Sequence, residues 1–238
     1  MRALWRLVFL ILNGVALLGG SVQCAKLAFE RGWLPAAYNP FGDLDVRAEP
    51  NVLTDFKRWR AARDPAFCQR ALASSDLRTV AVPDFEADGG CGMSHGYRIL
   101  RGQAALSSSF LASCPLALGY AMFEQHRLQP AAQRIFGRSV QRVEHYGSYA
   151  CRNVNHAKAG RLSQHARANA LDLAAFVLAD GRRITVLHDW HRADDAGRFL
   201  TEVFDGACAS FRIVLGPDYN ALHRNHFHVD MGGFHFCR

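Results

Sequence analysis

Residues 225–231 have the sequence NHFHVDM, and this stretch decides how the C-terminal part of the chain folds. Apolar and polar side chains alternate along it, which predicts a β-strand because successive side chains of a strand point to opposite faces. His226, His228 and Asp230 then share one face, and the phenylalanine and valine between them point into the core. Buried polar groups cost several kcal/mol unless they gain a partner. Two interpretations follow: these three side chains bind a metal ion, or they are exposed to solvent.

A second segment supplies the same kinds of side chain. His165 and Asp172 are seven positions apart, with Asp172 near the start of a strand predicted at 170–178 and His165 in the loop before it. The same spacing would place both on one face of a helix, so their pairing does not depend on the element. Together with a histidine of the 225–231 strand, they match the three protein ligands of a catalytic zinc site. An ordinary ion pair is the alternative for His165 and Asp172 taken alone.

The remaining pattern mixes helices with strands. Two apolar runs on either side of Asp180-Gly181 predict a β-hairpin. Helices are expected at 114–128, 131–136 and 199–211, with Pro130 interrupting the first two, and strands at 170–178, 183–187, 211–215 and 225–231. Residues 140–145 alternate too imperfectly to select an element. Because strands and helices do not alternate strictly, the sequence predicts an α+β domain with a small mixed or antiparallel sheet and flanking helices.

The composition excludes several classes of protein. Half of the 238 residues are hydrophobic and 21% are charged, which rules out a disordered chain and a multi-span membrane protein. The formal net charge of +7 favours an anionic partner. Residues 57–60 are a basic stretch around a tryptophan, which we interpret as a solvated or lipid-facing surface, so no nucleic-acid partner is expected.

The N-terminus predicts export. Two arginines precede residues 7–25, a run without charged side chains, which is typical of an export signal or a single membrane anchor. We expect an uncleaved inner-membrane anchor over residues 1–25, with a cleaved signal peptide as the alternative. Both place the rest of the chain in the periplasm or cell envelope. Residues 26–60, which three prolines interrupt, are expected to be a tether before a globular domain at 61–238.

Six cysteines follow the N-terminal segment, and an even number outside the cytosol predicts three disulfides. They are Cys68, Cys91, Cys114, Cys151, Cys208 and Cys237. The sequence does not choose among the possible pairings, and buried free thiols are the alternative. None of the six shows C-x-x-C spacing, which argues against a cysteine zinc site.

The separate motifs match a known pattern. The string Ser163-x-His165-x4-Ala170-x-Asp172, followed by His226-x-His228, resembles the zinc fold of D-Ala-D-Ala peptidases and lysostaphin-type enzymes, which hedgehog domains share. The stretch from about Cys68 to Arg238 resembles the bacterial extensin-like C-terminal domain family more closely. The supporting strings are Cys91-Gly92, residues 147–152, residues 163–172, residues 215–220, His223-x2-His226-Phe227-His228-x-Asp230 and the terminal Cys237-Arg238.

The resemblance implies roles for individual residues. His165, Asp172 and His228 fall at the zinc-ligand positions, so the expected cofactor is Zn²⁺. His226 falls where the relatives have a catalytic base or a group that stabilises the transition state. Arg152 falls where an arginine polarises the scissile carbonyl and stabilises the oxyanion. Zinc would lower the pKa of bound water towards ~7, so that amide hydrolysis proceeds at neutral pH.

Further residues are expected around this site. Ser163 is placed to orient a ligand by hydrogen bonding, and His223 and Asp230 are expected to line the cleft or support the ligands. Trp190 follows the second hairpin strand and is a candidate for the cleft wall, with core packing as the alternative. The peptidase pattern has glycine where this chain has Ala168, and alanine at positive φ would cost on the order of 1 kcal/mol.

These expectations define a function. An exported zinc amidase of this pattern would act on peptidoglycan stem or cross-link peptides, as an endopeptidase or carboxypeptidase, with the N-terminal segment contacting the membrane. The alternative is a non-catalytic zinc-containing module that binds peptidoglycan or supports the cell envelope. Arg152 and His226 beside a full ligand set favour the enzyme, because a binding module needs neither. The sequence indicates no oligomeric state.

Overall fold

The structure is a computed structural model that describes residues 13, 16 and 19–238. The anchor or signal peptide predicted at 1–25 lies largely outside these residues. Among the described residues, no helix is both long enough and apolar enough to cross a bilayer. The chain divides into two compact units: residues up to Asp43 together with Pro50–Lys57, and Leu44–Glu49 together with Arg58–Arg238.

The first unit is small and mainly helical. It is helical over residues 19–30 and has a short 3₁₀ turn, η1 (Ala36–Tyr38). The side-chain amide of Asn51 donates a hydrogen bond to the carbonyl of Ala37 at 3.1 Å and so connects two parts of this unit. Helix α2 (Thr54–Ala61) begins in the first unit and ends in the second.

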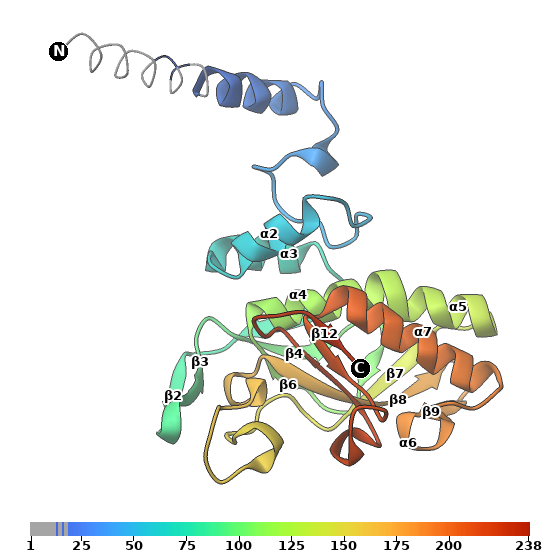
Figure 1. Cartoon of the computed structure of the whole chain (residues 1–238). Coiled ribbons are helices and arrows are strands. Elements are labelled where there is room, and N and C mark those ends of the chain that lie inside the picture. The colour runs from blue at the N-terminus through green and yellow to red at the C-terminus, as the bar shows by residue number, and fades with distance from the viewer. Residues whose placement is uncertain (1–12, 14–15, 17–18) are drawn as a thin grey trace. The chain divides into compact units, whose positions relative to one another are not determined.

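The second unit is built around a seven-stranded sheet (Figure 1). Its strand order is β12 (Phe236–Cys237), β10 (Ile213–Leu215), β11 (Phe227–Asp230), β8 (Ala170–Leu178), β7 (Val140–His145) and β5 (Ala105–Leu106), with β9 (Arg183–Thr185) also paired to β8. The pairs are antiparallel except β10 with β12 and β5 with β7. Strands β8 and β11 lie side by side, which brings together the two segments that contain the candidate ligands.

Two smaller sheets complete the strands of the described chain. One has the order β1 (Arg78–Ala81), β4 (Tyr97–Arg101) and β6 (Phe110–Ala112), and the other pairs β2 (Phe85–Ala87) with β3 (Cys91–Met93). Both are antiparallel. The predicted α+β class, with small and mostly antiparallel sheets, is confirmed.

Helices α4 (Cys114–Phe123), α5 (Gln129–Phe136) and α7 (Asp195–Ser210) of the second unit cover one face of the large sheet. The unit also has the α-helices α3 (Pro65–Ala73) and α6 (Val186–Asp189). A π-helical turn η3 (Glu124–Leu128) joins α4 to α5, and the 3₁₀ turns are η2 (Asp88–Gly90), η4 (Val154–His156), η5 (Gln164–Arg167) and η6 (Ala221–His223). Figure 1 shows α4, α5 and α7 together over the sheet.

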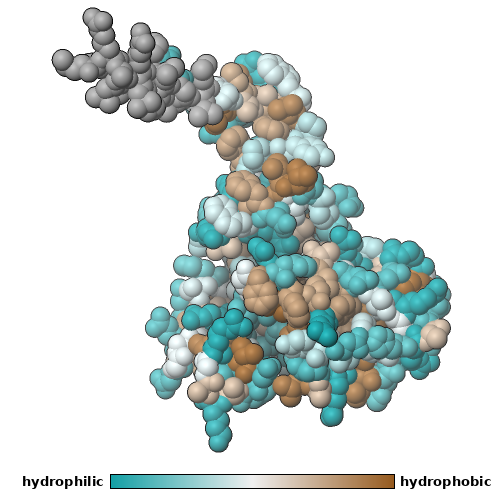
Figure 2. Space-filling model, viewed as in Figure 1, coloured by the Kyte–Doolittle hydropathy of each residue, from teal (hydrophilic) through white to brown (hydrophobic). Residues whose placement is uncertain are grey.

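The core lies between these helices and the sheet. Phe199 of α7 packs edge-to-face on Phe176 of β8, with ring centroids 5.6 Å apart, and neither side chain is exposed. Figure 2 shows hydrophilic residues over most of the visible face of this unit, with smaller apolar patches between them. The helices therefore cover one face of the sheet and leave the other free for the loops that form the site.

The predicted interruption at Pro130 is wrong. The chain stays helical from α4 through η3 to α5, and Pro130 occupies the first turn of α5. Proline is tolerated in the first turn of a helix. The wider π turn before it keeps the chain helical without an α-type bond to the proline nitrogen.

Two side-chain caps move the boundaries of other predicted elements. The strand predicted at 183–187 ends at Thr185, because this side chain accepts a hydrogen bond from the His188 N–H at 3.2 Å and begins α6. The helix predicted at 199–211 begins at Asp195, because Asp194 accepts hydrogen bonds from two backbone N–H groups of the first turn. Strand β8 has the bounds that the sequence predicts, and the imperfectly alternating 140–145 segment is strand β7.

The three predicted disulfides are present. They pair Cys68 with Cys114, Cys91 with Cys151, and Cys208 with Cys237. The first joins α3 to α4, the second joins β3 to the loop before Arg152, and the third joins α7 to β12. The remaining cysteine of the described chain, Cys24, is exposed and unpaired.

Candidate metal centre

Three side chains from two neighbouring strands and one 3₁₀ turn meet at the free face of the sheet. In the β8–β11 ladder, His228 is directly opposite Asp172. The turn η5 places His165 beside them, and Ser163 begins this turn by accepting a hydrogen bond from the His165 N–H at 3.3 Å. Ser163 therefore orients the backbone of a candidate ligand, while its hydroxyl makes no bond to the imidazole.

The three side chains form a compact triangle. The His165 Nε2 atom lies 3.1 Å from His228 Nδ1 and 3.2 Å from Asp172 Oδ1, and His228 Nδ1 lies 2.9 Å from the same oxygen. The side chains are 3%, 11% and 13% exposed for His165, His228 and Asp172. Within the described chain, this is the group of histidine, cysteine and acidic side chains whose spacing suits a metal ion.

The outer nitrogen of each ring faces an oxygen that accepts hydrogen bonds. His165 Nδ1 lies 3.1 Å from the Ser148 carbonyl, and His228 Nε2 lies 2.9 Å from Asp230 Oδ2. Asp230 is itself fixed, because its other oxygen accepts the Gly232 N–H at 2.7 Å. A carbonyl or a carboxylate only accepts, so each outer nitrogen must bear the proton.

The inner atoms of the triangle then lack a donor. With both outer nitrogens protonated, two imidazole lone pairs and one carboxylate oxygen face one another at about 3 Å, and a cation must lie between them. Tetrahedral zinc with bonds of about 2.0–2.1 Å keeps its ligand atoms roughly 3.3 Å apart. Histidine ligands of metals commonly donate their second N–H to a carbonyl or carboxylate. The donor set and its supports therefore fit zinc, and a proton is the other cation that the site can hold.

The electrostatics of the metal-free site agree with this argument. Burial lowers the pKa of His228, but hydrogen bonds to Asp172 and Asp230 outweigh it and raise the pKa to about 9. Burial also acts to raise the pKa of Asp172, yet hydrogen bonds from the two histidines hold it well below its usual range. At neutral pH, a metal-free chain therefore keeps an extra proton inside the triangle.

His226 lies next to the triangle and is neutral. Its Nε2 atom is 3.5 Å from Asp172 Oδ1, and burial lowers its pKa below the ordinary value of 6.5. Its Nδ1 atom lies 3.0 Å from the side-chain oxygen of Asn225, whose amide nitrogen donates to the Tyr146 hydroxyl at 3.3 Å. Asn225 therefore holds the proton of His226 on Nδ1 and leaves Nε2 able to accept one.

His223 extends the row of imidazoles. Its ring centroid lies 5.3 Å from that of His226 and 5.8 Å from that of His228, and its Nδ1 atom is 2.8 Å from the side-chain oxygen of Asn220. Burial, together with the neighbouring histidines, lowers the pKa of His223 to about 4. This ring is uncharged at neutral pH and forms part of the wall of a cavity.

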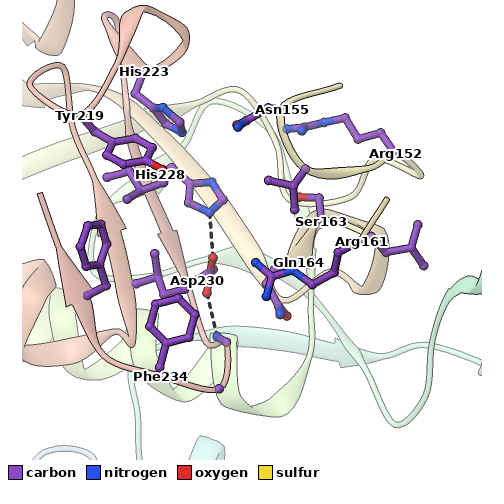
Figure 3. Close-up of a pocket in the computed structure, with 17 residues that line it drawn as sticks. Arg152, Asn155, Arg161, Ser163, Gln164, Tyr219, His223, His228, Asp230 and Phe234 are labelled. Carbon is purple, nitrogen blue, oxygen red and sulfur yellow. Dashed lines mark hydrogen bonds and ion pairs between the residues drawn. The ribbon is translucent and has the colours of Figure 1, made fainter. Parts of the chain in front are cut away.

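The cavity has a volume of about 470 Å³ and borders the triangle through His228. Arg152 also lines it, directly after the disulfide-bonded Cys151. Within the described part of the chain, the Arg152 side chain forms no hydrogen bond or ion pair, and its charge helps to lower the pKa of His223 and His226. Figure 3 shows Arg152 across the cavity from His223 and His228. A cation is therefore available beside the candidate metal position.

The backbone at Ala168 is left-handed, with φ 48° and ψ 38°, where the chain leaves η5. The positive φ considered from the sequence is therefore present at this alanine. Its N–H bonds the His165 carbonyl at 3.1 Å, and its carbonyl accepts the Ser113 N–H at 2.8 Å. The side chain is fully buried, and the neighbouring ligand His165 keeps its place in the triangle.

Trp190 lies away from this site. Its ring packs against Phe227 and Phe204, with centroids 5.1 and 5.6 Å away, and its indole N–H donates to Asp218 at 3.2 Å. Phe227 points to the opposite face of β11 from His226 and His228. Trp190 therefore packs against the core side of the sheet and does not line the cavity beside the triangle.

Several supporting groups were not found from the sequence. The Ser148 carbonyl is a backbone atom and gives no side-chain signal. Asn225 and Asn220 precede His226 and His223 by one and three positions. An amide at such a position can fix the ring of a nearby histidine, and this signal was available.

The comparisons with known proteins give one match. Residues 66–238 match the family described as "Extensin-like protein C-terminus". The match covers more than half of the chain and almost the same stretch as the sequence resemblance. No curated protein and no solved structure matches the chain.

Proposed function

The chain belongs to the family of extensin-like protein C-terminal domains, and on that premise we propose that it is a zinc-dependent peptidase that hydrolyses amide bonds in peptidoglycan stem or cross-link peptides. The observation that supports this most directly is the triangle of His165, Asp172 and His228, in which two ring nitrogens and a carboxylate oxygen meet at 2.9 to 3.2 Å. We extend the proposal to the fold, which we take to be of the D-Ala-D-Ala peptidase type.

Each residue has a part in the proposed reaction. His165, Asp172 and His228 would hold zinc, which when bound supplies Lewis acidity that activates water and polarises a carbonyl. His226 accepts a proton at Nε2, because its ring is neutral and Asn225 fixes its other nitrogen. Arg152 supplies positive charge where the carbonyl oxygen becomes an oxyanion.

The envelope is the proposed location. The basic start and uncharged run of the N-terminal segment support export with a membrane contact. The three disulfides support an oxidising compartment. The net charge of +7 suits peptides that carry carboxylates.

Hydrolysis of isolated muropeptides tests the enzyme directly. The zinc-loaded chain should release new peptide fragments, which chromatography with mass spectrometry detects. The His226→Ala variant should have a kcat lower by about a hundredfold or more. His188→Ala is the matched control, because His188 is an exposed histidine on α6 outside the site, and it should leave kcat unchanged. A zinc-loaded chain that leaves every muropeptide intact would instead support the non-catalytic module. Full activity of the His226 variant would refute the role given to that residue.

A further inference from the structure

The cavity beside the triangle has two chemically different walls. One wall is apolar and aromatic and is formed by Ile213, Leu215, Tyr219, Phe234 and Phe236. Tyr219, Phe234 and Phe236 remain 38%, 53% and 37% exposed, so their rings can bury further surface against a ligand. Figure 3 shows Tyr219 and Phe234 on one side of the cavity and Arg152, Arg161 and Ser163 on the other, with His228 and Asp230 between them.

The opposite wall is basic. Arg152 and Arg161 both line it, and among the residues that the structure describes neither side chain forms a hydrogen bond or an ion pair. The acid among the lining residues is Asp230, and its two oxygens already accept from His228 and Gly232. No described acid of the cavity therefore neutralises the two arginines.

The backbone holds Arg161 at this position. The Arg161 carbonyl accepts the Val154 N–H at 3.0 Å, and an isolated bridge pairs Asn153 with Leu162. The loop from Asn153 to Leu162 is thus closed on itself, which fixes the point from which the Arg161 side chain enters the cavity. The Arg161 backbone is therefore held, and its exposed side chain lines the cavity.

The two arginines have different surroundings. Arg152 follows the disulfide-bonded Cys151 and lies across the cavity from His223 and His228 (Figure 3), whereas Arg161 lines the cavity from the closed 153–162 loop. With Arg152 assigned to the carbonyl oxygen of the scissile amide, Arg161 is free to bind a second, separate anionic group of the same substrate.

We propose that this cavity selects peptides with a free carboxylate within one or two residues of the scissile amide, which binds Arg161 while apolar parts of the peptide pack on Phe234 and its neighbours. This specificity rests on the proposed peptidase function. A volume of about 470 Å³ accommodates a ligand of a few residues. An arginine binds a carboxylate with two charge-assisted hydrogen bonds, which a neutral amide cannot replace.

Three small probes test the proposal by binding alone, and the first two differ only in the terminal carboxylate or carboxamide. They are acetyl-alanyl-alanine, its C-terminal carboxamide, and acetyl-alanyl-glutamate carboxamide, whose carboxylate lies on a side chain, each in L and D forms. Calorimetric titration into the full chain, metal-free and zinc-loaded, gives the Kd of each. At least one of the acids should bind about tenfold more tightly than the neutral carboxamide. Comparison of the two acids shows whether the carboxylate is terminal or on a side chain.

Three variants separate the two walls. Arg161→Gln should remove the preference for the acid and leave the Kd of the carboxamide unchanged. Phe234→Ala should raise the Kd of the acid and of the carboxamide by similar factors. Arg78→Gln removes an exposed arginine on β1 outside the cavity and should change neither Kd. Equal binding of acid and carboxamide by the unmodified chain, no binding of any probe, or an acid preference that persists in Arg161→Gln would overturn the proposal.

The binding assay and the hydrolysis assay test different claims, so each claim can be refuted while the other stands. Acid-selective binding that depends on Arg161, without hydrolysis of muropeptides, would refute the peptidase and leave the carboxylate site in place. Hydrolysis that treats acid and carboxamide substrates alike, with Arg161→Gln fully active, would refute the carboxylate site and leave the peptidase in place.

Discussion

At the scale of single residues, His228 has the most constrained position in the site. Asp172 lies 2.9 Å from one ring nitrogen and Asp230 lies 2.9 Å from the other. Both carboxylates stabilise the protonated ring, which is why the pKa rises to about 9 despite burial. A metal ion at the inner nitrogen must displace this proton, so proton and metal compete for the same lone pair.

This competition predicts an unusual pH dependence of zinc affinity. Zinc binding should strengthen about tenfold per pH unit between pH 7 and pH 9, because the displaced proton has a pKa of about 9. Histidine ligands with an ordinary pKa near 6.5 would give a nearly constant affinity over this range. Competition with a chelator of known affinity at each pH measures the slope.

Asp230→Asn provides the control for that measurement. The variant keeps a side-chain oxygen near the outer nitrogen but removes one negative charge, so the pKa of His228 should fall and the affinity should level off at a lower pH. A zinc affinity that is constant between pH 7 and pH 9 in the unmodified chain would contradict the electrostatic account of His228.

At the scale of elements, the turn η5 places the ligand His165 and ends in a left-handed alanine. An L-residue in this conformation costs about 1–2 kcal/mol. Glycine would remove that cost, but it would also lose a buried methyl group, worth about 0.8 kcal/mol. It would further destabilise the folded chain by about 0.4–1 kcal/mol, because it raises the conformational entropy of the unfolded chain. The opposing contributions nearly cancel, so alanine is an adequate residue at position 168.

Substitutions at Ala168 test this balance. Ala168→Gly should change the free energy of unfolding by less than about 1 kcal/mol and leave zinc binding intact. Ala168→Val should destabilise by about 2–3 kcal/mol, because a β-branched side chain is strained at positive φ and the site is fully buried. Urea unfolding of the metal-free chain measures both. A loss of more than about 2 kcal/mol in the glycine variant would show that the methyl group matters more than the backbone strain.

The elements also show what a sequence can predict. Strands β8 and β11 were predicted because both contain long apolar or alternating runs, and their face assignment follows directly from the period of two. Strands β1 and β5 were missed, because β1 is mostly exposed and β5 has two residues. These strands form because they pair with strands that are distant in the sequence, and local sequence patterns carry no information about such pairing.

The same distinction holds for the site. Its histidines and Asp172 were predicted because their residue types and spacing are those of metal ligands. The Ser148 carbonyl and Arg161 were not predicted, because a backbone atom has no residue signature and an arginine in a loop resembles any surface arginine. The disulfide partners, such as Cys91 and Cys151, are 60 positions apart and become defined only in the folded chain.

At the scale of the whole molecule, the described part of the second unit has its helix-covered core on one face of the large sheet and its candidate site on the other. The helices α4, α5 and α7 cover one face of the large sheet (Figure 1). The candidate ligand His228 lies on the other face, because it alternates along β11 with the core residues Phe227 and Val229. Disulfides fix segments at the cavity, since Cys91–Cys151 precedes Arg152 and Cys208–Cys237 ties β12 to α7. Substitutions at the triangle should therefore affect metal binding before they affect the core.

The measurement that tests the central claim most directly is the zinc content of the folded chain. The chain is expressed in an oxidising compartment, and bound metal is determined by elemental mass spectrometry beside His228→Ala and the control His188→Ala. The account predicts about one zinc per chain in the unmodified protein and in the control, and none in His228→Ala, with the far-ultraviolet circular dichroism of all three unchanged. Absence of zinc from the unmodified chain after zinc is supplied, or retention of zinc by a folded His228→Ala variant, would contradict it.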